Sequence, residues 1–329
     1  MKRPTWLPDN LVLLLLATVA LATVLPVHGR GVAVLDGLTQ AAVALLFFLQ
    51  GSKLSRRAVL EGLLHWRLHA LVFAATFLLF PLLGLALRPW LQPWVGPELY
   101  VGVLFICALP STVQSSIAFT SMARGNVAAA MCSASASNIL GMAVTPLLMA
   151  AMAGAGTGGV HLSWHTLEGI AGTLLLPFVA GQALQRWTGP WVAKRKAWVR
   201  VSDQSTILLV VYGAFSAATV EGLYRHLPPV TLLAVLAICA LLLAVVMALL
   251  TVVSRSLGFS REDEIAIVFC GSKKTLASGV PMAQILFAGQ AVGLVVLPLM
   301  VFHQLQLMVC ASLARRYARG PAAQPVVAG

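Results

Sequence analysis

Residues 270–279, Cys-Gly-Ser-Lys-Lys-Thr-Leu-Ala-Ser-Gly, place two consecutive lysines in the middle of a long apolar segment. The segment runs from about Glu262 to Ala288 and is long enough to cross the roughly 30 Å apolar core of a bilayer as a helix. Lys273 lies about 16 Å along such a helix from Glu262, which is near mid-depth in the bilayer. Each central lysine costs about 2.5–3.5 kcal/mol on insertion scales, so both lysines need partners inside the protein.

The composition of the whole chain indicates an integral membrane protein. Of its 329 residues, 59% are hydrophobic and 10% are charged, and the mean hydropathy is +0.90. Soluble domains carry about 25% charged residues, so a soluble enzyme is excluded. The net charge of +12 does not indicate nucleic-acid binding, because the basic residues lie in short segments between apolar runs. The five cysteines lack CxxC spacing and indicate neither a disulfide framework nor a zinc site.

Ten apolar runs have the length of membrane-spanning helices. The first five are expected at about Asn10–Val27, Val34–Gly51, Leu68–Leu87, Glu98–Arg124 and Val127–Ala153. The second five are expected at about Thr166–Trp187, Gln204–Gly222, Val230–Ser254, Glu262–Ala288 and Gly289–Ala314. We therefore predict an all-α integral membrane protein with ten transmembrane helices.

The distribution of Lys and Arg predicts that both termini are cytoplasmic. In this orientation 17 basic residues fall on the cytoplasmic side, and only Arg30, Arg88 and Arg225 fall on the other side. Cytoplasmic loops carry such an excess, and we expect a multi-pass protein of the plasma or inner membrane. For the first run alone a secretory signal is the alternative, because Lys2 and Arg3 precede it, although no clear cleavage pattern follows.

Two of the expected spans contain matching polar interruptions. Residues 109–116, Leu-Pro-Ser-Thr-Val-Gln-Ser-Ser, interrupt the fourth span as residues 270–279 interrupt the ninth. A tight break follows each span, at residues 124–126 and 288–290. Matching defects indicate an internal repeat, and a five-helix repeat crosses the membrane in the opposite sense, so we predict an inverted 5+5 repeat with discontinuous helices 4 and 9. The alternative is that Pro110 only kinks a helix and Gly271 only eases packing.

The repeat also predicts the domain organisation. The first five-helix repeat covers residues 1–153, and the second covers residues 154–317. Residues 318–329 are small and contain proline and glycine, so we expect them to form a disordered tail.

The paired interruptions predict a binding site, because unwound backbone at membrane depth is tolerated only where it is buried in protein or lines a cavity. Free carbonyls at half-helix ends favour cations, and half-helix N-termini favour anions. We expect at least one ammonium to face a cavity and attract an anionic substrate, unless both lysines snorkel to an interface. The candidate substrate or ion-binding residues are the polar side chains in or beside the breaks: Ser111, Thr112, Gln114, Ser115, Ser116, Asn138, Ser272, Lys273, Lys274, Thr275, His303 and Gln304.

The order of these features along the chain is distinctive. Leu109-Pro110 precedes a Ser-rich break, residues 123–126 read Ala-Arg-Gly-Asn, and His303-Gln304 lie on the last span. Over nearly the whole chain this layout resembles the bile acid:sodium symporter family, and residues 269–281 resemble its sodium-bile-acid-symporter-like (SBF-like) branch. The resemblance implies a panel of spans 1, 2, 6 and 7 and a core of spans 3, 4, 5, 8, 9 and 10. Helices 4 and 9 would cross in the core, and substrate would pass between panel and core by alternating access.

At the sodium site of that family, the resemblance implies a changed ligand set here. Phe269 stands where the family has a glutamate, and Lys273 and Lys274 stand where it has glutamine and asparagine. The other changed positions are Thr76 for a glutamine of the third helix, and Ala130 and Ala134 for hydroxyl residues of the fifth. Because an ammonium replaces a sodium ion in charge and space, we expect no sodium coupling through this site.

The expected function is therefore a secondary transporter or uniporter of a small organic anion, with Lys273 and Lys274 in place of the sodium-site ligands. A buried ammonium that gains and loses a proton is a further means of coupling. Two alternatives stay open: a membrane regulator or scaffold that keeps the fold, and a residual sodium-coupled, bile-acid-like symporter. A hydrolase using Ser111 or Ser272 is disfavoured, because sequence-adjacent Ser and Lys are no dyad signature, so we predict no enzyme activity.

No cofactor and no metal are expected, because the sequence contains no phosphate loop, dinucleotide fingerprint or metal-ligand spacing. The expected partners are the organic anion and membrane lipid, and not nucleic acid. The sequence leaves the oligomeric state and the identity of the substrate open.

Overall fold

The computed structural model describes residues 10–53, 65–154, 172, 176–220, 222, 228–288 and 290–319, and within them the regular structure is entirely helical. The α-helices are α1 Asn10–Val24, α2 Arg30–Lys53, α4 Trp66–Ala74, α5 Phe80–Ala86, α6 Arg88–Val95, α7 Pro97–Ala108, α8 Gln114–Met122, α9 Val127–Gly154, α11 Leu176–Ala183, α12 Gln185–Lys194, α13 Lys196–Val220, α14 Pro229–Ser256, α15 Arg261–Ser272, α16 Leu276–Leu286 and α17 Val292–Arg319. A π-helical turn, η2 Ala75–Leu79, joins α4 to α5. The prediction of an all-α protein is confirmed for these residues.

Five segments are long and apolar enough to cross a membrane, which makes this a multi-pass membrane protein. They are α2, the continuous segment Trp66–Ala86, Val127–Met152 of α9, α14 and α17, and they coincide with expected spans 2, 3, 5, 8 and 10. The helices of expected spans 4 and 9 are individually too short, because each span is divided into two helices of at most 12 residues. The full set of ten spans and their inverted repeat stays a prediction.

The C-terminal boundary of the last helix differs from the expected one. α17 continues through Arg319, so residues 318 and 319 are helical and the prediction that the disordered tail begins at 318 was wrong. Two hydrogen bonds anchor this last turn: the Tyr317 hydroxyl donates to Glu264 (2.8 Å), and Arg261 donates to the Tyr317 carbonyl (2.8 Å). Several expected features lie outside the described residues, namely residues 320–329, residues 166–171 and 173–175 of the sixth span, and the loop residues Lys2, Arg3, Arg56, Arg57 and Arg225.

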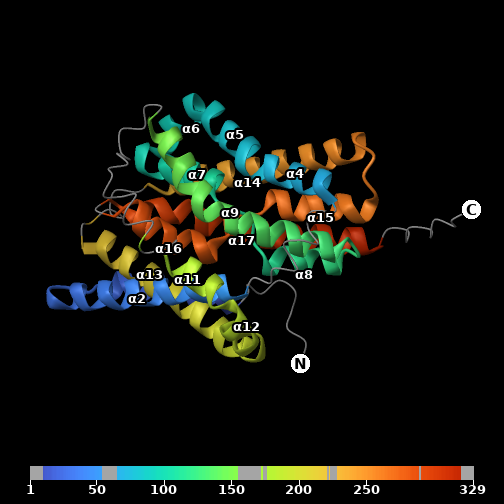
Figure 1. Cartoon of the computed structure of the whole chain (residues 1–329). Coiled ribbons are helices and arrows are strands. Elements are labelled where there is room, and N and C mark those ends of the chain that lie inside the picture. Colours follow the sequence, from blue (N-terminus) through green and yellow to red (C-terminus); the bar gives the residue numbers. More distant parts are fainter. Residues whose placement is uncertain are drawn as a thin grey trace, which may run out of the picture.

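The described helices form two groups. α2, α11, α12 and α13 pack together along one side of the molecule, and α1 packs on α13 (Figure 1). The second group contains α4 to α9 and α14 to α17 (Figure 1). The main packing between the groups is made by α13 against α16 and α17. The lysine-bearing segment between α15 and α16 therefore belongs to the second group and lies at the start of a helix that contacts the first.

One face of α9 holds the interruption between α7 and α8. Ser137, Gly141 and Thr145 are spaced by four residues and so lie above one another on the helix. Ser137 Oγ accepts from the Ser111 amide (3.1 Å), and Thr145 Oγ1 donates to the carbonyl of Ala108 at the end of α7 (2.8 Å). Between them, a Cβ on Gly141 would overlap the ring of Pro110. The glycine therefore allows the close approach on which both hydrogen bonds depend.

Gly141→Ala is expected to lower the free energy of unfolding by about 1–3 kcal/mol, because the added methyl group overpacks the contact with Pro110. The measurement is thermal unfolding of the purified protein in detergent. Gly37→Ala is the matched control, since Gly37 lies in α2 with nothing within 4 Å of an added Cβ. Equal unfolding temperatures for the two variants would contradict the proposed fit between α9 and the interruption.

Candidate functional site

The two predicted interruptions are present, and they touch one another. α7 ends at Ala108 and α8 begins at Gln114, while α15 ends at Ser272 and α16 begins at Leu276. The amide of Thr275 in the second interruption donates to the carbonyl of Pro110 in the first (3.0 Å). Four half-helix ends consequently meet at one place inside the second helix group.

The ammonium of Lys274 lies among three backbone carbonyl oxygens. Its Nζ donates to Leu109 (2.7 Å) and Cys107 (3.1 Å) at the end of α7, and to Thr76 (2.9 Å) in η2. The Phe80 ring centroid lies 4.1 Å from the same nitrogen, within cation–π range. The side chain is fully buried, and its three N–H groups are all used. The negative end of the α7 dipole also favours this charge.

The π-helical turn explains why the carbonyl of Thr76 is free. In η2 the Phe80 amide donates to Ala75, five residues back, and not to Thr76. The residue five positions after Thr76 is Pro81, which has no N–H to donate. Thr76 therefore presents an unused carbonyl oxygen inside the bundle, and Lys274 supplies the missing donor.

The ammonium of Lys273 has very different surroundings. Its single hydrogen-bond acceptor among the described residues is Ser115 Oγ (3.2 Å), in the first turn of α8. The ring centroids of Phe119 and Phe269 lie 4.4 and 5.8 Å from Nζ. The side chain is fully buried, yet the part of the chain that the structure describes offers no acceptor to two of its three N–H groups. A helix N-terminus carries partial positive charge, so this position attracts an anion more than a second cation.

A chain of hydroxyl groups stabilises the charge on Lys273. Ser115 Oγ donates to Thr112 (2.9 Å), Thr112 and Ser116 share a hydrogen bond (3.2 Å), and Ser116 donates to the Phe269 carbonyl (3.2 Å). Because Ser115 and Ser116 donate away from the ammonium, the Ser115 oxygen is free to accept from Lys273. Of the hydroxyls predicted from the first interruption, Ser115 therefore contacts Lys273 directly, and Thr112 and Ser116 continue the chain behind it.

The last helix holds the peptide unit of Lys274 from the other side. Gln306 Oε1 accepts from the Lys274 amide, and Gln306 Nε2 donates to the Lys274 carbonyl, both at 2.8 Å. Nε2 also lies 2.9 Å from Nδ1 of His303. At the start of α16, Ser278 donates to Asn138 Oδ1 (3.1 Å) and lies 3.3 Å from Thr275 Oγ1.

The structure thus joins most of the predicted site residues in one hydrogen-bonded cluster. Four predicted members are not joined by side-chain contacts. Gln114 is exposed, Ser272 Oγ donates within α15 to Val268 (2.6 Å), and Ser111 Oγ and Gln304 Oε1 are buried with no partner among the described residues. Ser111 takes part through its backbone amide. Sequence reasoning missed Phe80, Phe119 and the carbonyl of Thr76, whereas the sequence places Gln306 with His303 and Gln304 on the cavity side of the last helix. The signal that could have exposed the Thr76 carbonyl is Pro81 inside an apolar helix.

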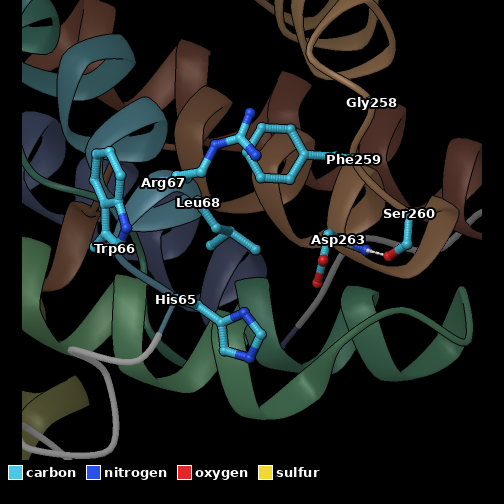
Figure 2. Close-up of a pocket in the computed structure, with 8 residues that line it drawn as sticks. All are labelled: His65, Trp66, Arg67, Leu68, Gly258, Phe259, Ser260 and Asp263. Atoms are coloured by element: carbon cyan, nitrogen blue, oxygen red, sulfur yellow. Dashed lines mark hydrogen bonds between the residues drawn. The ribbon is translucent and has the colours of Figure 1, made fainter.

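A pocket of about 280 Å³ lies apart from the interruptions, between the start of α4 and the connection from α14 to α15. Figure 2 shows Arg67 beside the ring of Phe259, at 5.5 Å from the centroid, and the hydrogen bond between Asp263 and Ser260. The other residues that line it are His65, Trp66, Leu68 and Gly258. The lysines are shielded from solvent in this conformation, so this pocket does not expose them.

Comparison with known proteins identifies the family. The model of the SBF-like CPA transporter family matches residues 9–319. The chain belongs to this family. This member is 59% identical over 319 residues to protein PA2026 of Pseudomonas aeruginosa (97% of this chain, 96% of that protein). It is 51% identical over 312 residues to "Putative symporter YfeH" of Escherichia coli (94% and 93%). It is 29% identical over 276 residues to sodium/bile acid cotransporter 7 of Danio rerio (83% and 81%).

Membership of the SBF-like CPA transporter family confirms the resemblance found in the sequence. The protein is a multi-pass membrane transporter of the bile acid:sodium symporter type. The position where the resemblance implied a changed ligand, Thr76, contributes a backbone oxygen to a lysine. In this SBF-like protein a covalently attached cation therefore lies where the interrupted helices meet.

Lys274→Met is expected to destabilise the protein by at least about 2 kcal/mol more than Lys273→Met. Removing Lys274 leaves three buried carbonyls without a donor, and each unsatisfied group costs about 1–3 kcal/mol. Removing Lys273 leaves only the Ser115 oxygen without its donor, and it also removes a buried charge that has a single hydrogen-bond acceptor. Thermal and denaturant unfolding in detergent would measure both. A Lys273 variant as unstable as the Lys274 variant would show that the two ammoniums are held equally.

Proposed function

We propose that this transporter moves a small organic anion across the membrane by alternating access, without sodium coupling. The observation that carries the proposal is the position of the Lys274 ammonium, 2.7–3.1 Å from three backbone carbonyl oxygens. Rings of backbone carbonyls are the groups with which membrane proteins replace the hydration shell of a monovalent cation. An ammonium tethered among such oxygens supplies the positive charge permanently and takes the space of a free ion.

The surroundings of Lys273 support an anion as the substrate. Among the described residues its ammonium has one acceptor, Ser115 in the first turn of α8, which in turn donates to Thr112, so two of its N–H groups remain for a ligand. A carboxylate or sulfonate there would form charge-assisted hydrogen bonds and interact favourably with the α8 dipole. We propose that Lys273 binds the anionic group, whereas Lys274 keeps the interruptions together.

The arrangement of the helices supports movement of one group against the other. Both ammoniums are shielded in this conformation, so substrate reaches Lys273 only after a conformational change. The contact between the groups is made mainly by α13 with α16 and α17, close to the second interruption. We propose that α1, α2 and α11 to α13 form the panel, that the other helices form the core, and that residues 1–153 and 154–317 are inverted repeats.

The orientation in the membrane is part of the same proposal. The excess of Lys and Arg in alternate loops supports cytoplasmic termini in a plasma or inner membrane. Arg255, Arg261 and Arg67 surround the start of α15 and would lie on the cytoplasmic side. We also propose that transport requires no enzymatic step, cofactor or metal, since the cation is part of the chain.

Replacing Na⁺ by N-methyl-D-glucamine is expected to change uptake into proteoliposomes by less than about twofold, because an ion without a site shifts no conformational equilibrium. Candidate carboxylates and sulfonates would be tested as labelled substrates. Uptake that is lost without Na⁺ would instead support a residual sodium-coupled symporter.

Lys273→Gln is expected to weaken anion binding about 10- to 100-fold, because a hydrogen bond to a charged group contributes about 1.5–3 kcal/mol. The shift of unfolding temperature across an anion concentration series measures this affinity. Ser272→Ala is the matched control at the neighbouring position, since its hydroxyl already donates within α15. An anion affinity unchanged in Lys273→Gln would remove Lys273 from the substrate site, and no effect of any anion on the wild type would favour a scaffold.

A further inference from the structure

The amide group of Gln306 can adopt only one orientation. The Lys274 N–H must face an oxygen and the Lys274 carbonyl must face an N–H, so Oε1 and Nε2 are assigned by the backbone itself. Rotating the amide by 180° would place donor against donor and acceptor against acceptor. Gln306 is fully buried, so water cannot replace these bonds without movement of the helix.

This orientation determines the protonation state of His303. The second N–H of Gln306 Nε2 points to His303 Nδ1, which is 2.9 Å away. Nδ1 must therefore accept, which requires a neutral imidazole with its proton on Nε2. The His303 side chain is half-buried.

We infer that His303 is the proton-binding residue of this transporter and that Gln306 transmits its charge to the peptide unit of Lys274. A proton added to the Nδ1 lone pair turns the acceptor into a donor that faces the Nε2–H of Gln306. Gln306 must then either withdraw from His303 or rotate and lose both hydrogen bonds to Lys274. Protonation thus releases the segment Lys273–Thr275 from α17.

Other titratable or charged residues lie on the helices that contact α17. The titratable or charged residues on the helices that contact α17 are Glu98, Tyr100 and Cys107 of α7, Lys196, Arg200, Asp203 and Tyr212 of α13, Cys239 and Arg255 of α14, and Arg261, Glu262, Asp263, Glu264 and Cys270 of α15, which contacts the last turn of α17 through Tyr317; α8 and α16 contain none. On α17 itself they are Cys310, Arg315, Arg316, Tyr317 and Arg319. Of the acids in this set, Asp203 pairs with Lys53 (2.7 Å) in the first helix group, and Glu264 pairs with Arg255 (2.8 Å). The groups linked to His303 through Gln306 are the two lysines of the interruption.

The consequence for transport rests on the proposed function. Lys273 and Lys274 lie on the segment that Gln306 holds. A proton on His303 would therefore free this segment to move and would add positive charge near the bound anion. A proton and an anion would then favour the same conformation, which is the requirement for their symport.

Hydrogen exchange of the full-length protein in lipid nanodiscs tests the link directly. The exchange rate of peptides containing Lys274 would be compared between wild type and His303→Gln at each pH, so that the intrinsic pH effect cancels. The ratio of wild type to variant is expected to be about 1 at pH 8 and to rise to about 10 at pH 5.5, across the range in which imidazole changes charge. A ratio that does not change with pH overturns the inference.

Matched variants distinguish loss of the Gln306–Lys274 hydrogen bonds from a general loss of stability. Gln306→Leu is expected to give fast exchange of the Lys274 amide at every pH, whereas Gln304→Leu, two positions away on α17, should keep the wild-type profile. His69→Gln is the control histidine, since His69 bonds to Ser133 (2.6 Å) away from the interruption. A wild-type profile in Gln306→Leu would contradict the transmitting role of Gln306.

Anion uptake into proteoliposomes with an acidic exterior distinguishes this inference from the proposed function. Faster uptake in the wild type but not in His303→Gln supports both. If the exchange ratio depends on pH as expected but no anion is taken up, the link from His303 through Gln306 to Lys274 stands and anion transport is refuted. Anion uptake together with a flat exchange ratio would leave the transport function and refute the proton-binding role of His303.

Discussion

The carbonyl oxygens at the interrupted end of α7 set the main constraint on this structure. The carbonyls of residues 107–110 bond to partners on other elements, and in an apolar interior each unpaired carbonyl would cost free energy. The Thr145 hydroxyl donates to the carbonyl of residue 108, the Thr275 amide donates to that of residue 110, and the Lys274 ammonium donates to those of residues 107 and 109. The first interruption can therefore exist only when the second is packed against it. The two helices depend on each other for their shape.

Because the two interruptions pack together, the two adjacent lysines have different surroundings. Lys274 points to the C-terminal end of α7, where the dipole and free oxygens satisfy a positive charge. Lys273 points to the first turn of α8, where the dipole opposes a positive charge and one hydroxyl accepts. An unwound segment permits this division, because successive side chains of an extended backbone point to opposite sides. Lys274, whose three N–H groups all have acceptors, is therefore adjacent to Lys273, whose ammonium has one acceptor among the described residues.

The hydrogen bonds also connect the site to the moving parts proposed for the transporter. Gln306 fixes the peptide unit of Lys274 to α17, and α16 and α17 are the helices that contact α13 of the first group. A change in the protonation of His303 or in the occupancy of Lys273 would act on the same short segment. In the proposed mechanism, the anion at Lys273, the proton at His303 and the contact between the helix groups would therefore all act on residues 273–306.

Much of this was readable from local patterns. Hydropathy and length predicted the membrane class and the five long spans. The polar residues between apolar runs predicted both interruptions and the need of the two lysines for partners inside the protein, because insertion cost depends on each segment alone. The partners of each lysine were decided only by tertiary structure. The oxygens that hold Lys274 belong to backbone 165–198 residues away, and one of them is free only because a π-helical turn precedes Pro81. Every residue has a carbonyl, so its availability depends on how the helices are interrupted and packed, and apart from Pro81 no side chain marks which carbonyls are free.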